Sequence, residues 1–121
     1  MTLHKVMVVE DDDDIREALS EILEEHGCEV SRAANGQKAL DYLVTASKLP
    51  CLILLDLMMP VMDGTAFREQ QLKDSRLAQI PVVVMSAYRD LDSVASKLGA
   101  VKTLKKPPKI EELVAAVQHH C

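Results

Sequence analysis

Short apolar runs alternate with segments of helical periodicity along the chain, and this alternation limits the possible folds more than any other feature. The run at 51–55 is unbroken and follows Pro50, which is typical of a strand buried on both faces of a sheet. We predict strands at about 5–9, 28–33, 51–56, 80–85 and 101–105. The helical patterns begin near residues 13–14, 37, 64–65, 90 and 109, and they end near 27, 47, 75, 98 and 119.

Five strands that alternate with five helices predict successive βαβ units with right-handed crossovers. The expected fold class is α/β, a doubly wound five-stranded parallel sheet with helices on both faces. The carboxyl ends of all five strands then lie at one edge, where ligands bind at the switch in strand order. With 121 residues, the chain is expected to form one domain over 1–121.

The apolar positions of the helices predict which side chains enter the core. In the second helix we expect Ala39, Leu40, Leu43 and Val44 to be buried, and in the third helix Phe67 and Leu72. Gly27 is suited to a left-handed cap at the end of the first helix.

Composition argues against nucleic-acid binding. The net charge is −5, no basic stripe is present, and the aromatic residues are only Tyr42, Phe67 and Tyr88. A nucleic-acid surface needs clustered positive charge and usually aromatic rings for base stacking. Direct contact with DNA is therefore not expected. With only three aromatic residues in the chain, the core must be mainly aliphatic.

The three cysteines are odd in number and show no CxxC spacing. No signal peptide or membrane-spanning run is apparent, so we predict a reduced, cytoplasmic setting. Cys28 and Cys51 are expected to be buried thiols, while Cys121 could form adventitious disulfides. The histidines (His4, His26, His119 and His120) show no ligand spacing with the cysteines and are predicted to lie at the surface.

Charged and polar side chains end several of the predicted strands. Glu10 and Asp11 follow the first strand, Asp56 ends the third, Ser86 follows the fourth and Lys106 follows the fifth. If the strand order is 2-1-3-4-5, these groups converge at the carboxyl edge of the sheet. Acids on two strands and a lysine on another suggest a single metal and phosphate site.

These residues belong to four motifs, and with them the chain resembles the receiver domain of response regulators in two-component systems, including the chemotaxis-type single-domain members. The motifs are Val8-Val9-Glu10-Asp11-Asp12, Asp56-Leu57-Met58-Met59-Pro60-x-Met62-Asp63-Gly64, Met85-Ser86-Ala87 and Lys105-Lys106-Pro107. The resemblance covers essentially the whole chain and implies a flavodoxin-like (βα)5 fold with strand order 2-1-3-4-5.

The resemblance also implies a role for each matching residue. Asp56 would be the phosphoacceptor, and Glu10, Asp11, Asp56 and the backbone carbonyl of Met58 would hold Mg²⁺ or Mn²⁺. Ser86 and Lys106 would contact the phosphoryl group, and the Lys106–Pro107 peptide bond would be cis. Magnesium is a hard cation that takes oxygen ligands, and it offsets the repulsion between a carboxylate and a phosphoryl dianion.

The implied function is to accept a phosphoryl group from the phosphohistidine of a sensor histidine kinase or phosphotransfer protein, and then to switch a binding surface for a downstream target or output domain. Ile15 and Ala18, with Pro107 and Pro108, would form the docking patch for the kinase; simple core packing is the other interpretation of this face. The chain would act as a switch and not as a turnover enzyme.

Three positions bear on how this switch would operate. Thr103 stands where the family carries a switching aromatic on the fifth strand, so we predict a modified or weaker conformational response. Met58 and Tyr88 are bulky residues that flank the site, and they predict slow autodephosphorylation because they screen the attacking water.

Two alternatives remain at this point. A phosphohydrolase of the haloacid-dehalogenase type also uses a strand-end aspartate, but that family needs a second aspartate where this chain has Met58. A phosphorylation-independent binding module on the same fold is favoured by Thr103 and opposed by Asp56, Lys106 and the acidic pair. The bland interpretation of the acidic run at 10–14 is a solvated charge block, with Asp12, Asp13 and Asp14 at a helix start.

Overall fold

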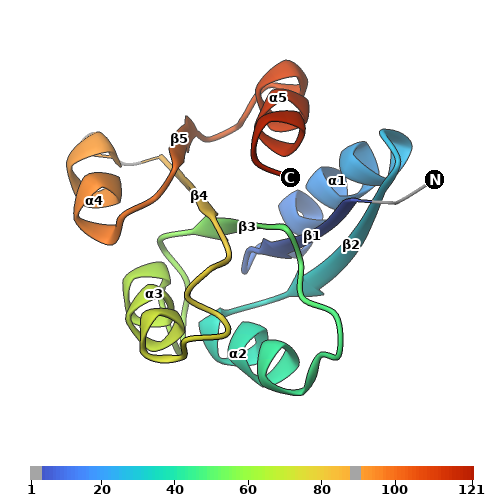
Figure 1. Ribbon diagram of the computed structural model, residues 1–121. Coiled ribbons are helices and arrows are strands. Elements are labelled where there is room, and N and C mark those ends of the chain that lie inside the picture. The colour runs from blue at the N-terminus through green and yellow to red at the C-terminus, as the bar shows by residue number, and fades with distance from the viewer. Residues whose placement is uncertain (1–3, 88–90) are drawn as a thin grey trace.

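The computed structural model describes residues 4–87 and 91–121 (Figure 1). Strands and helices alternate throughout, as β1 (His4–Val9), α1 (Asp13–Glu25), β2 (Cys28–Ala33), α2 (Gly36–Thr45), β3 (Leu52–Asp56), α3 (Gly64–Lys73), β4 (Val82–Ser86), α4 (Leu91–Leu98), β5 (Lys102–Lys105) and α5 (Ile110–His120). All strand pairs are parallel, and the order is β2-β1-β3-β4-β5. The predicted fold class and strand order are therefore confirmed.

The sheet separates two apolar layers, because successive side chains of a strand point to opposite faces. On one face Ile53 and Leu55 of β3 pack with residues of α2 and α3, and with Ala95 of α4. On the other face Leu52 and Leu54 pack with residues of α1 and α5. Figure 1 shows α1 and α5 on one side of the sheet and α2 and α3 on the other. Every residue of β3 is buried, as the unbroken apolar run predicts.

Side-chain caps define where three of the helices begin. The side chains of Asp12, Asn35 and Asp63 each accept a hydrogen bond from the backbone N–H three residues later, at 3.0, 2.9 and 2.9 Å. These bonds satisfy N–H groups that have no partner within the helix. At the other end of α1, Gly27 has a φ of +86°, which confirms the predicted left-handed cap.

Two side chains that we expected in the core are exposed. Val44 of α2 is 56% exposed and Leu72 of α3 is 50% exposed. In their place α3 buries two polar residues, Arg68 and Gln71. Phe67 is fully buried, as predicted, but the apolar pattern of α3 is weak, so periodicity alone placed Leu72 in the core and missed the buried polar residues.

Arg68 and Gln71 form a buried polar network that joins three segments. Gln71 donates to the carbonyls of Leu77 and Ile80, at 2.9 and 3.1 Å, in the connection to β4. Arg68 donates to Gln71 at 2.8 Å and to the carbonyl of Leu98, the last residue of α4, at 2.9 Å. The network thus holds both ends of the β4–α4 unit against α3.

The cysteines differ from the prediction. Cys51 is not a buried thiol but forms a disulfide with Cys121, although 70 positions separate the two residues. The end of α5 lies beside the start of β3, which brings the two Cα atoms to 5.1 Å, and this proximity cannot be read from sequence spacing. Cys28 is buried and free, as expected, and burial raises the pKa of its thiol.

Among the residues that the structure describes, none of the helices combines the length and the apolar character needed to cross a bilayer.

The polar network makes a prediction about stability. Gln71→Ala removes the partner of two carbonyls and of the Arg68 guanidinium, so we expect the free energy of unfolding to fall by about 1–3 kcal/mol. Gln70→Ala is the matched control, because Gln70 is the exposed neighbour on the same helix. Urea denaturation measures both variants. Equal midpoints for the two would show that the network contributes nothing.

Candidate functional site

A cavity opens at the carboxyl edge of the sheet, over the ends of β1, β3 and β4. The side chains that line it are Glu10, Asp11, Asp12, Ile15, Asp56, Met58, Ser86, Ala87 and Lys106. The parallel sheet explains this convergence, because β3 lies between β1 and β4 and all three strands end at the same edge. The structure thus brings together Glu10, Asp11, Asp56, Ser86 and Lys106.

Burial differs among these groups. Glu10 and Asp56 end or follow buried strands and are 0% and 2% exposed, and Ser86 is 1% exposed. Asp11 lies in the loop after β1 and is exposed to solvent. One carboxylate therefore stands at the mouth of the cavity and two lie at its floor.

Lys106 bridges the two buried carboxylates. Its Nζ lies 3.0 Å from Asp56 Oδ2 and also contacts Glu10 Oε1. Burial alone lowers the pKa of a lysine, but the hydrogen bonds and negative charges of Glu10 and Asp56 outweigh it and raise the pKa of Lys106. The ammonium form is therefore the one that the site stabilises.

Backbone contacts fix the position of each group. Asp56 Oδ1 accepts a hydrogen bond from the Met58 N–H at 3.2 Å. The Lys106 N–H donates to the Ser86 carbonyl at 3.2 Å, which extends the pairing of β4 with β5. The Lys106–Pro107 bond is cis, as the resemblance implied.

Two residues that our sequence analysis did not single out also shape the site. Arg16 donates to the backbone carbonyl of Glu10 at 2.9 Å, which ties the end of β1 to α1. Gly64 lies so close to β3 that an added Cβ would stand 2.7 Å from the Asp56 carbonyl oxygen. Arg16 lies about one turn after the predicted helix start. The sequence does not show that its side chain reaches back to the carbonyl of Glu10. Gly64 is part of the motif that begins at Asp56, but the motif alone does not reveal its close packing on β3.

The acidic side chains could hold a metal ion. One carboxylate oxygen from each of Glu10, Asp11 and Asp56 lies within 4.8 Å of the others. Among the described residues that line the cavity, four carry carboxylates and only Lys106 carries an ammonium. A hard divalent cation with oxygen ligands would offset this excess of negative charge, so the donor set fits such an ion.

The remaining predicted positions that the structure describes lie at the cavity, on α1, on β5 or in the connection from β5 to α5. Met58 is 57% exposed at the rim. Thr103 is half-buried on β5, where it pairs in register with Val84 of β4. Ile15 and Ala18 are exposed on α1, Pro107 is exposed and Pro108 is half-buried. Tyr88 lies outside the described residues.

Comparison with known proteins decides the family. A family model described as the response regulator receiver domain matches residues 6–118. The chain belongs to this family. It is 34% identical over 123 residues to the sporulation initiation phosphotransferase F of Bacillus subtilis, which covers 99% of this chain and 95% of that protein. The chemotaxis response regulator CheY4 of Vibrio cholerae has a similar structure, with a TM-score of 0.88 and 30% identity over 99% of this chain and all of that one.

The receiver domain is also part of larger relatives. It is 41% identical over 115 residues to the DNA-binding transcriptional regulator NtrC of Escherichia coli, which covers 93% of this chain. The chain spans about a quarter of the length of that regulator. The family assignment makes this chain a component of two-component signal transduction.

The carboxylate cluster predicts how divalent cations bind. Asp11→Asn removes an anionic ligand from the cluster, so we expect Mg²⁺ and Mn²⁺ to bind at least about tenfold more weakly. Loss of a residue that only hydrogen-bonds to a metal ligand already weakens metal binding by about tenfold or more, and loss of a ligand should cost at least as much. Asp14→Asn makes the same change in charge outside the cluster and should leave affinity within twofold, roughly what one distant screened charge contributes. Isothermal titration calorimetry measures both. Equal losses would show that the cation responds only to net charge.

Proposed function

We propose that the receiver domain accepts a phosphoryl group on Asp56 from the phosphohistidine of a sensor histidine kinase or phosphotransfer protein. The observation that carries this proposal is the contact between Lys106 Nζ and Asp56 Oδ2, at 3.0 Å, in a cavity with two further carboxylates. A carboxylate at the end of a buried strand, facing a cavity and with an ammonium beside it, is arranged to be a nucleophile toward a phosphoryl group.

The transfer exchanges one bond for another at phosphorus. An oxygen of the Asp56 carboxylate attacks the phosphorus, the bond from phosphorus to the imidazole nitrogen breaks, and the histidine leaves with the electron pair. Asp56 then carries an acyl phosphate. The Met58 N–H already donates to Asp56 Oδ1, which holds the carboxylate in a fixed orientation before the transfer.

Lys106 and Ser86 stabilise the transferred group in this proposal. After the transfer, the Lys106 ammonium remains beside Asp56 and can pair with a phosphoryl oxygen, while its contact with Glu10 holds it in place. Ser86, the last residue of β4, supplies a hydroxyl from the neighbouring strand. Glu10, Asp11, Asp56 and the Met58 carbonyl would hold Mg²⁺ or Mn²⁺, which supplies charge neutralisation at the phosphoryl oxygens.

The proposal extends to partners and location. We place the kinase contact on Ile15 and Ala18 of α1 with Pro107 and Pro108, since Ile15 also lines the cavity. The phosphorylated domain would act as a switch for a downstream protein target or output domain, in the cytoplasm, without direct contact with nucleic acid or membrane. How far Thr103 alters the conformational response stays a prediction.

Phosphoryl acceptance is tested with intact protein, Mg²⁺ and a small acyl-phosphate donor. We expect one phosphoryl adduct by mass spectrometry that is labile to hydroxylamine, requires Mg²⁺ and is absent from Asp56→Ala. Asp63→Ala serves as the matched control, because Asp63 caps α3 and lies outside the metal-binding cluster. If wild-type protein gives no adduct where another receiver domain reacts, the binding-module alternative replaces this proposal.

Dephosphorylation tests the part assigned to Met58. Its exposed side chain lines the cavity, where it would screen the acyl phosphate from an attacking water. We expect Met58→Asn to shorten the half-life of the phosphorylated domain by about tenfold, the low end of what a positioned polar group contributes to proton transfer. Val61→Asn is the control, because Val61 is exposed in the same loop and does not line the cavity. An unchanged half-life would remove Met58 from the mechanism.

A further inference from the structure

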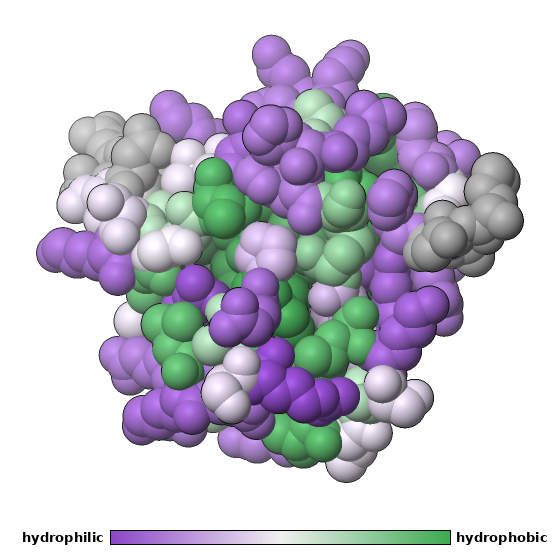
Figure 2. Space-filling view, viewed as in Figure 1, coloured by the Kyte–Doolittle hydropathy of each residue, from purple (hydrophilic) through white to green (hydrophobic). Residues whose placement is uncertain are grey.

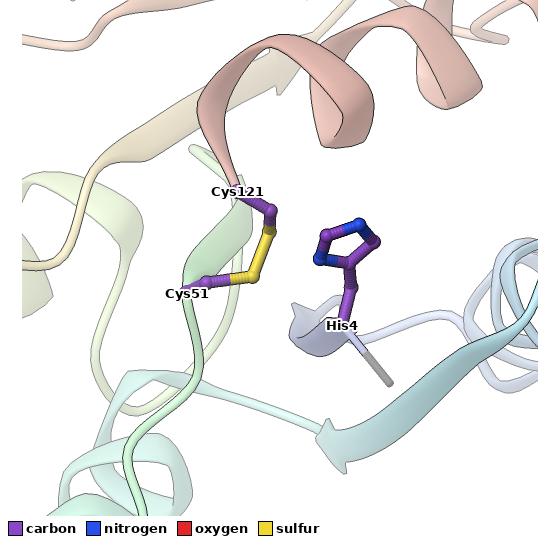
Figure 3. Close-up of side chains that lie close together, drawn as sticks. All are labelled: His4, Cys51 and Cys121. Atoms are coloured by element: carbon purple, nitrogen blue, oxygen red, sulfur yellow. A yellow bond between two sulfur atoms is a disulfide. The ribbon is translucent and has the colours of Figure 1, made fainter. Parts of the chain in front are cut away.

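Three side chains meet at the edge of the sheet opposite the phosphorylation site (Figure 3). His4 begins β1, Cys51 immediately precedes β3, and Cys121 follows the last residue of α5. One imidazole nitrogen and the two sulfur atoms all lie within 4.8 Å of one another. Figure 3 shows the ring of His4 beside the disulfide. Sequence spacing gave no sign of this cluster, since its members come from the start, the middle and the end of the chain.

The backbone holds each of these residues by bonds other than the disulfide. His4 pairs in register with Cys28 of β2. The Cys51 N–H donates to the carbonyl of Lys5 at 2.8 Å, which fixes Cys51 beside the start of β1. The Cys121 N–H donates to the carbonyl of Val117 at 2.9 Å, which continues α5. Opening the disulfide therefore leaves both thiols close to His4.

These donors differ from those at the phosphorylation site. Two thiolates and an imidazole are the ligands of Zn²⁺ and similar metal ions, whereas carboxylates suit Mg²⁺. In a tetrahedral zinc site, donor atoms stand about 3.5–3.8 Å apart, given bonds of about 2.0–2.3 Å to the metal. The observed spread is within 4.8 Å, so a small side-chain movement completes the geometry.

The site is open to solvent on one side. His4 is exposed, and both cysteines are half-buried. In the view of Figure 1 the C-terminus lies inside the outline of the molecule, and Figure 2, from the same direction, shows hydrophobic and hydrophilic residues interspersed over this face. Three protein ligands with water in the fourth position is a known arrangement for zinc.

We propose that His4, Cys51 and Cys121 form a binding site for a single thiophilic divalent cation, Zn²⁺ by its chemistry, when the disulfide is reduced. A dithiol reductant transfers two electrons and two protons to the disulfide and becomes a disulfide itself. The two new thiols release their protons when they bind the metal as thiolates. The disulfide therefore links the start of β3 to the end of α5, and the metal would link both of them to β1 as well.

This site goes beyond the proposed function and is spatially separate from it. Cys51 immediately precedes β3 and Asp56 ends it, so at about 3.3 Å per residue the two lie roughly 16 Å apart. Disulfides are rare in a reducing cytoplasm. In the compartment proposed above, the metal would thus be the link that holds the end of α5 to the sheet.

The test uses Co²⁺ as a spectroscopic probe of the intact protein. The protein is reduced with a dithiol, freed of it without oxygen, and titrated with Co²⁺ in the presence of excess Mg²⁺, which keeps the carboxylate site occupied. We expect a thiolate-to-cobalt charge-transfer absorption that saturates at one equivalent and disappears when Zn²⁺ is added. The disulfide form should give no such absorption.

Variants separate this site from other thiol chemistry. Cys51→Ser and Cys121→Ser should abolish the absorption, and His4→Ala should weaken Co²⁺ binding at least about tenfold, the lower end of the cost of losing even an outer-shell partner. His26→Ala, which removes another exposed histidine outside the cluster, should change nothing. Circular dichroism confirms that each variant is folded, and alkylation of the reduced wild-type thiols replaces a serine variant that does not fold. No absorption in the reduced protein, saturation at half an equivalent, or an unchanged affinity in His4→Ala would each overturn the proposal.

Discussion

The burial of β3 between two apolar layers is the constraint on which the rest of this receiver domain depends. Its five residues are all buried, four of them aliphatic and the last an aspartate. Because Leu52 and Leu54 face α1 and α5 while Ile53 and Leu55 face α2 and α3, the strand cannot shift by one residue without exchanging its two sets of contacts. Asp56 is therefore held at one height along the sheet.

Electrostatics then determine what this edge can do. Parallel strands bring Glu10, Asp56 and Ser86 to the same edge, and the loop after β1 adds Asp11. Repulsion among the carboxylates opposes this arrangement, and the Lys106 ammonium offsets only part of it. The remaining negative charge favours a cation, and in the proposed function such a cation would lower the repulsion between a carboxylate and a phosphoryl dianion.

The two edges of the sheet carry different chemistry for the same topological reason. Strand ends gather hard oxygen donors at the carboxyl edge, whereas the amino edge gathers His4 and Cys51 with Cys121 from α5. The disulfide at the amino edge joins the residue after α5 to the residue before β3, and α5 begins at Ile110, three residues after Pro107.

The sequence by itself determined the order and type of the elements, because apolar runs and helical periodicity are local patterns. The patterns are strong here because the central strands are buried on both faces of the sheet. It also determined which strand ends carry Glu10, Asp56, Ser86 and Lys106, and the family motifs supply the roles proposed for them. Tertiary structure decided the rest. Leu72 is exposed while Gln71 is buried, because Gln71 donates hydrogen bonds to the carbonyls of Leu77 and Ile80. The apolar pattern of the helix gives no indication of these contacts. Cys51 pairs with Cys121 because packing of α5 on the sheet brings together residues that are distant in the chain.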